Sequence, residues 1–142
     1  MANYDKKIIN EIAQELDCGN DCYFNPKTKE IIAIPNYSII SDEELFEEFF
    51  GSDVEKVNER EADFIKLEVL QSFESFKIME RFVEQIDDQK FKAALENALQ
   101  RRKPFRNFKY LIDDSDFRQD WFDFKQNELE KRVEKELEHG DF

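Results

Sequence analysis

The sequence predicts an α+β fold with an N-terminal helix, a small antiparallel sheet and a C-terminal cluster of about four helices. Apolar residues recur at spacings of three and four over residues 4–17 and again after residue 72, as on the buried face of a helix. Between these segments, β-branched runs flank the turn dipeptide Asn25-Pro26. The 142 residues include 15 Phe, four Tyr and one Trp, which argues for an aromatic core and against disorder. We expect a single domain over residues 1–142.

The first elements are a helix and a β-hairpin. The helix covers residues 4–17, and Gly19 suits its C-terminal cap. The hairpin covers residues 22–34, where Asn25 accepts a local backbone hydrogen bond and Pro26 presets φ for a type I turn. The return strand should stop at Pro35, which has no N–H to donate to a ladder.

An acidic stretch over residues 41–63 follows the hairpin, and it is the segment we most expect to be mobile. Ser41 to Glu44 has the capping-box pattern, which predicts a short helix closed by Gly51, and Ser52 begins a second such pattern. The run FIKLEV over residues 64–69 alternates apolar and polar residues, which predicts a third strand. A helix is the alternative for so short a run.

Residues 72–138 are predicted to be helical throughout. One apolar stripe runs from Phe73 to Ile86 and another from Phe91 to Leu99. Pro104 suits the first position of the next helix. The inward side chains of this helix are expected to be Phe105, Phe108, Leu111 and Ile112. Ser115 or Asp116 caps the last helix, which should end near Glu138, before Gly140.

The last helix carries two apolar stripes. Phe117, Trp121 and Phe124 point one way, whereas Phe122, Leu129, Val133 and Leu137 point roughly 150° away. Simple wrapping around the core is the favoured interpretation. The alternative is that the second half reaches a different surface, so Leu129, Val133 and Leu137 are a candidate partner surface.

The segment RRKPFRNFKYL over residues 101–111 is basic in an acidic chain. It holds five cations and no acid, although the whole chain has a net charge of −13. The candidate anion or nucleic-acid patch is Arg101, Arg102, Lys103, Arg106, Lys109 and Tyr110.

A structural interpretation of this segment competes with the functional one, and we favour it. Arg101 to Lys103 would occupy the last turn of a helix, where cations meet the negative end of the macrodipole. Arg106 and Lys109 would pair with acids on other helices. Only Tyr110 would be free to stack on a base.

Other chemistry is weakly represented. Cys18 and Cys22 would need Asp17 and Asp21 to complete a zinc site, because His139 lies at the far end of the chain. The simpler interpretation is two small apolar residues between a helix and a strand. No phosphate-binding Gly loop, HExxH or serine elbow is present. We therefore expect no catalytic, cofactor-binding or metal-binding residues, and we disfavour an enzyme.

The expected location is the cytoplasm. The N-terminal residues lack an apolar run of signal-peptide length, and no run approaches the roughly 18 apolar residues of a membrane span. The charge of −13 disfavours non-specific binding to DNA or anionic membranes and favours a basic partner.

The order of these landmarks is similar to that in the small acidic bacterial proteins of uncharacterised protein family 0158. The resemblance runs from about residue 10 to 138 through CYxNPxTxEI, SFESFKIMERFV, ALENALQRRKPFRNFK and WFDF. It implies a stand-alone domain of one hairpin plus helices, with no established activity and no catalytic residues to transfer. Where members often carry Gly before FxxF, this chain has Arg102-Lys103-Pro104, so we expect a different bend there. The matching positions are Phe76, Met79, Phe82, Leu95, Phe105, Phe108, Trp121 and Phe124.

Several functions are compatible with these observations. The leading hypothesis is a non-enzymatic module, monomeric or weakly dimeric, that binds another macromolecule and above all a protein. The second is a nucleic-acid-binding protein that uses the basic patch. The third is an enzyme or a metal-binding protein of unknown type, and DNA mimicry ranks last.

Overall fold

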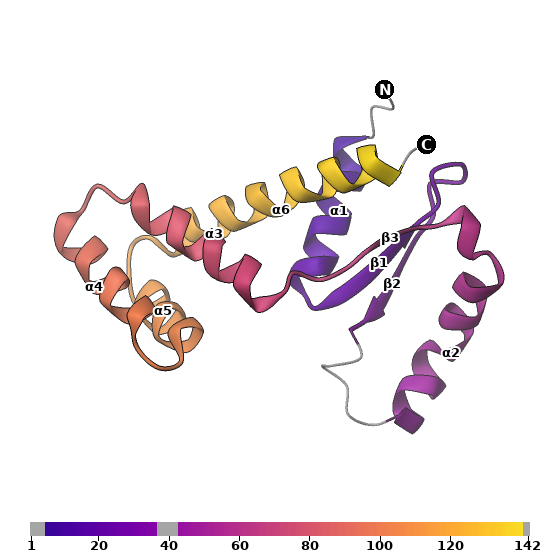
Figure 1. Cartoon of the computed structure of the whole chain (residues 1–142), viewed down its shortest axis with the longest axis horizontal. Helices are drawn as coiled ribbons and strands as arrows, with labels where there is room; N and C mark the ends of the chain where they lie inside the picture. Colours follow the sequence, from indigo (N-terminus) through magenta and orange to yellow (C-terminus); the bar gives the residue numbers. More distant parts are fainter. Residues whose placement is uncertain (1–4, 37–42, 141–142) are drawn as a thin grey trace. The chain divides into compact units, whose positions relative to one another are not determined.

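A computed structural model describes residues 5–36 and 43–140 of the chain (Figure 1). The fold is α+β, as predicted, and the described residues form six α-helices and a three-stranded antiparallel sheet. They fall into two compact units. The sheet unit comprises residues up to 69 together with those from 129 onward, and the helical unit comprises residues 70–128. That the two form a single domain stays a prediction.

The sheet unit begins with α1 (Lys6–Asp17), which confirms the predicted first helix. The Asp5 carboxylate accepts a hydrogen bond from the Lys7 N–H at 2.9 Å and so caps the first turn. Gly19 ends the helix with φ at 93°, a left-handed conformation in which glycine carries no Cβ penalty.

The predicted hairpin is present, and it pairs with the predicted third strand. The three strands are β1 (Asn20–Phe24), β2 (Ile31–Pro35) and β3 (Ile65–Leu67), in the order β2-β1-β3. The Asn25 side chain accepts hydrogen bonds from the N–H groups of Lys27 and Thr28, which holds the turn. β2 runs one residue beyond the expected stop, to Pro35 opposite Asn20. An edge strand tolerates this proline because its outward side needs no donor.

The two faces of the sheet have separate cores. On one face Cys22, Phe24 and Leu67 are fully buried, and the Cys22 thiol approaches the Ile12 carbonyl of α1 at 3.9 Å. On the other face Ile32 and Ile34 pack with Val57 of α2 (Glu43–Glu59). A short 3₁₀ turn, η1 (Glu61–Asp63), links α2 to β3.

Helix α2 corrects the expectation of two short helices in the acidic stretch. The helix is continuous through Gly51 and Ser52, so Gly51 does not end it. Phe46, Phe50 and Val54 pack at helical spacing against the apolar face of the sheet, and this packing outweighs the weak helix propensity of one glycine. The expected cap at Ser41 lies outside the described residues.

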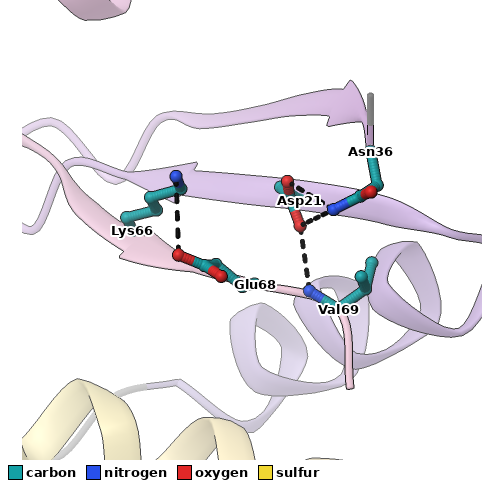
Figure 2. Close-up of polar contacts among 5 residues, drawn as sticks. All are labelled: Asp21, Asn36, Lys66, Glu68 and Val69. Carbon is teal, nitrogen blue, oxygen red and sulfur yellow. Dashed lines mark hydrogen bonds and ion pairs between the residues drawn. The ribbon is translucent and has the colours of Figure 1, made fainter. Parts of the chain in front are cut away.

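Asp21 ties three segments of the sheet unit together (Figure 2). Its carboxylate accepts a hydrogen bond from the Val69 N–H at 2.9 Å, just after β3, and from the Asn36 side-chain amide at 3.2 Å, just after β2. Lys66 and Glu68, also drawn, form an exposed ion pair at 3.5 Å. One carboxylate of β1 is thus hydrogen-bonded to the residues that follow both neighbouring strands, β2 and β3.

The helical unit contains α3 (Ser72–Glu84), α4 (Gln89–Gln100), α5 (Pro104–Asp113) and the first part of α6 (Arg118–Gly140). Its core is aromatic. The Phe82 ring contacts those of Phe108, Trp121 and Phe124, with centroids 5.3–6.4 Å apart. Pro104 occupies the first turn of α5, as predicted. The last helix continues through Gly140, two residues beyond the expected end.

The two stripes of α6 belong to different cores. Phe117, Trp121 and Phe124 pack in the helical unit. Leu129, Val133 and Leu137 are buried, and they belong to the sheet unit. The favoured expectation of wrapping around one core is therefore replaced by the alternative, with the second surface supplied by the same chain.

Candidate functional site

The first three cations of the basic segment lie in the linker between α4 and α5, and the rest of the segment lies within α5. α4 ends at Gln100, and Arg101 adopts an extended conformation with ψ at 170°. The expectation that Arg101, Arg102 and Lys103 occupy a last helical turn is therefore wrong. Lys103 has φ at 59° and ψ at 55°, a left-handed conformation directly before Pro104. The three cations thus project from a short linker.

Asn107 fixes the position of this linker. Its side-chain amide donates to the Arg102 carbonyl at 2.9 Å and to the Ala98 carbonyl at 3.4 Å. These carbonyls lie at the end of α4 and just beyond it, where the helix leaves acceptors unpaired. One side chain of α5 therefore holds the adjoining end of α4.

The five cations of the basic segment are exposed and lack acidic partners within residues 5–36 and 43–140. Arg106 and Lys109 were expected to pair with acids on other helices, and among the described residues this expectation is wrong. Two arginines outside the segment do pair with acids: Arg118 pairs with Asp113, and Arg81 pairs with Glu128, each at 3.4 Å.

The aromatic residues of the segment differ in exposure. Phe108 is buried, as expected, but Phe105 is 42% exposed and meets the Phe76 ring edge-on at 6.3 Å. The expectation that Phe105 faces inward is therefore only partly right. Tyr110 is 75% exposed, which leaves both its ring and its hydroxyl accessible.

A groove of about 360 Å³ lies between α4 and α5, and we call it the basic groove. The α4 side and the linker contribute Ala94, Asn97, Ala98 and Arg101. The α5 side contributes Arg106, Asn107, Tyr110 and Leu111. Its apolar part is formed by Ala94, Ala98 and Leu111, and its charge comes from two guanidinium groups. Arginine presents planar, paired donors that match a carboxylate or phosphate.

The groove belongs to the less acidic unit. Residues 70–128 contain 11 Lys and Arg against 12 Asp and Glu, a net charge of −1. The rest of the chain has 10 cations and 22 acids, a net charge of −12. The overall charge of −13 therefore does not describe the surroundings of the basic groove within its own unit.

Sequence reasoning overlooked three residues of this site. Ala94 falls on the apolar stripe that the sequence predicts between Phe91 and Leu99, but it is exposed on the groove, and nothing in the sequence pattern points to Asn97 or Asn107. The signal was Ala94 and Ala98, two small residues four apart, which leave space beside a neighbouring helix. Only the structure shows that the neighbour is α5.

The other candidate residues are the apolar stripe in the second half of α6 and the two cysteines. Leu129, Val133 and Leu137 are buried by the chain itself, so they offer no free partner surface. Cys18 is exposed and Cys22 is buried, and both are free thiols. In the described part of the chain, no three His, Cys, Asp or Glu side chains are grouped to hold a metal ion. Within the same residues, no helix is long and apolar enough to cross a membrane.

Comparison with known proteins places the chain in a family. The sequence model of an uncharacterised protein family, UPF0158, matches residues 3–142. The chain belongs to this family. The UPF0158 protein PA5073 of Pseudomonas aeruginosa is 30% identical over 135 residues, which cover 94% of this chain and 82% of that protein. No solved structure matches the chain.

Membership of UPF0158 brings no established activity, because the family is uncharacterised. The resemblance inferred from the hairpin and the helical motifs is thereby confirmed. The residues of this chain itself, above all those of the basic groove, are therefore what points to a function.

Proposed function

We propose that this member of UPF0158 is a non-enzymatic interaction module that binds another protein through the basic groove. One observation carries the proposal: Arg101, Arg106 and Tyr110 surround a groove and are exposed, and neither arginine pairs with an acid in the described residues. A chain with 34 acids has many opportunities to neutralise these arginines internally.

The residue types favour a protein partner. Arginine and tyrosine are enriched among the few residues that dominate binding energy at protein interfaces. Both combine a hydrogen-bonding group with a flat surface for packing. The apolar part of the groove, with Ala98 and Leu111, adds a place for a partner's side chain to leave water.

A nucleic acid is the second candidate, favoured by one observation. The five exposed cations are interleaved with Phe105 and Tyr110, which resembles the composition of single-strand binding surfaces. Phe105 packs against Phe76, however, so Tyr110 is the main stacking platform of the segment. Such binding would weaken steeply with salt as counterions are retained by the nucleic acid.

The state of the two cysteines agrees with a cytoplasmic location, which we propose alongside this function. Cys18 and Cys22 are both free, and the exposed Cys18 thiol suits a reducing compartment.

The test is an affinity purification from a lysate of the source organism near physiological salt, with and without nuclease. The bait is the wild-type chain, the double variant Arg101→Glu/Arg106→Glu, or a matched control, Lys131→Glu/Lys135→Glu. The control makes the same charge change at exposed cations of α6, outside the groove.

We expect a protein that is retained by the wild type and by the control, survives nuclease treatment and is lost with the groove variant. Loss of all partners on nuclease treatment would replace this function with nucleic-acid binding. Equal retention by both double variants would exclude the basic groove as the site.

A further inference from the structure

The dimensions of the basic groove suit one side chain rather than a helix or a folded surface. Its volume is about 360 Å³. Ligand pockets range from roughly 300 to 1,000 Å³, so the groove is close to the smallest of them. The groove is bounded by two short helices, of 12 and 10 residues. A partner would therefore insert a single anchor and lay the residues on either side of it over the rim.

The apolar part of the groove specifies what that anchor is. Ala94 is exposed, Ala98 is buried and Leu111 is half-buried, and all three line the groove. Their methyl groups offer no hydrogen bonds. A polar anchor would lose its hydration without replacement there, whereas a branched apolar side chain would gain from leaving water.

The charges on the rim specify the flanking residues. Arg101 leaves the end of α4 and Arg106 lies in the first turn of α5. The positive end of the α5 dipole disfavours a cation at Arg106 and favours an anion beside it. Two guanidinium groups on the border of an apolar groove match two carboxylates that flank an apolar residue.

We propose that the basic groove binds a short acidic segment of a partner protein in which one Leu-like side chain is flanked by Asp or Glu. The anchor enters between Ala94, Ala98 and Leu111, the carboxylates bind Arg101 and Arg106, and the Tyr110 ring covers the anchor. This proposal rests on the proposed function and names the chemistry of its partner.

Asn107 is the positioning residue of this site. Its amide N–H groups are engaged by the carbonyls of Ala98 and Arg102, so it holds the linker that carries Arg101. Its own amide lines the groove as well, with the side-chain oxygen as the remaining acceptor.

The test measures the binding of labelled peptides to the full chain by fluorescence anisotropy. The probe is an acidic peptide containing Asp-Glu-Leu-Glu-Asp, the control peptide replaces Leu by Ser, and a single-stranded oligonucleotide of equal charge is the third ligand. The protein variants are Ala94→Leu, which fills the groove, and Ala93→Leu, which adds the same side chain at an exposed neighbouring position that does not line it. Tyr110→Ser is a second variant, at a residue that is 75% exposed and therefore buries little surface in the core.

We expect the Leu peptide to bind the wild type roughly tenfold more tightly than the Ser peptide, as for the burial of a Leu-sized side chain. Ala94→Leu and Tyr110→Ser should each lose this preference, and Ala93→Leu should keep it. Equal binding of the two peptides, tighter binding of the oligonucleotide, or an unaffected Ala94→Leu variant would overturn the proposal. If the purification partner still depends on Arg101 and Arg106 while the peptides show no preference, the proposed function stands and this inference fails.

Discussion

Lys103 adopts a conformation that lysine disfavours. Its φ of 59° places the Cβ close to the backbone, at a cost of roughly 1–2 kcal/mol relative to right-handed geometry. Glycine lacks this penalty, so we expect Lys103→Gly to raise the free energy of unfolding by about 1 kcal/mol. Urea denaturation of the variant and the wild type measures the difference.

Lys109→Gly is the matched control, because Lys109 is exposed within α5 in ordinary helical geometry. There glycine should lower the free energy of unfolding by about 1 kcal/mol. Changes of the same sign for the two variants would show that the left-handed linker does not exist in solution.

Cys22 predicts a pH dependence of stability. Burial, followed by the charges of Glu15, Asp21 and Glu11, raises the pKa of its thiol from about 9 to about 12. The unfolded thiol therefore loses its proton first. Its contribution to stability is complete below about pH 9 and declines as the pH rises through 12.

We expect the free energy of unfolding to fall more between pH 8 and 10.5 in the wild type than in Cys22→Ala. In the native protein a thiol reagent should modify Cys18 quickly and Cys22 only on unfolding, because Cys18 is exposed and Cys22 is not. Equal pH slopes, or two fast thiols, would contradict the buried position of Cys22.

At the level of elements, two glycines have opposite roles: Gly51 lies in the interior of a helix, and Gly19 lies just after the end of one. Gly51 lies inside α2, where the atoms nearest to an added Cβ belong to the flexible Glu47 side chain, whose carboxylate oxygen at 2.7 Å would have to move. Gly51→Ala should therefore raise the free energy of unfolding by about 1 kcal/mol. Gly19 has φ at 93°, so Gly19→Ala should lower the free energy of unfolding by about 1 kcal/mol. Thermal unfolding of both variants measures these changes in stability. Destabilisation by Gly51→Ala would contradict a continuous α2 and favour two short helices that meet at Gly51.

Asp21 joins the strands to the segments that follow them, and its loss should be costly. Charge-assisted hydrogen bonds to the Val69 N–H and the Asn36 amide predict that Asp21→Ala lowers the free energy of unfolding by about 2 kcal/mol. Glu68→Ala, which breaks the exposed ion pair with Lys66, should cost less than about 1 kcal/mol. Chemical denaturation of each variant tests the ranking, and equal costs would refute the role given to Asp21.

Elements with strong local signals could be predicted from the sequence. Gly19, Pro104 and the turn at Asn25 act through their own backbone preferences, and the structure confirms all three. Gly51 wrongly predicted a helix end, because α2 is stabilised by the packing of Phe46 and Phe50 against the sheet, a contact between residues distant in sequence. Local preference cannot anticipate such packing.

The candidate site was predictable only in composition. The sequence indicates the cations of residues 101–109 and Tyr110 as a patch, but it does not indicate whether these cations have acidic partners. Whether Arg106 finds an acid depends on which carboxylates the folded helical unit brings within reach of it, as it brings Glu128 to Arg81 and Asp113 to Arg118. The groove itself depends on Ala94 facing α5, which only the packing of two helices determines.

For the molecule as a whole, most of the acidic charge and the proposed binding surface are in separate units. The sheet unit holds a net charge of −12, and the helical unit, with the basic groove, holds −1. We propose that a partner binds in this groove, whose lining residues all lie within the helical unit.

The most direct measurement is a titration of the isotopically labelled full chain with the Asp-Glu-Leu-Glu-Asp peptide, followed by NMR chemical shifts. We predict that the largest shifts fall on Arg101, Arg106 and Tyr110 and on the side-chain amides of Asn97 and Asn107, with the sheet unit unaffected. Shifts centred on any other surface, or none at saturating peptide, would contradict the assignment of the basic groove as the binding site.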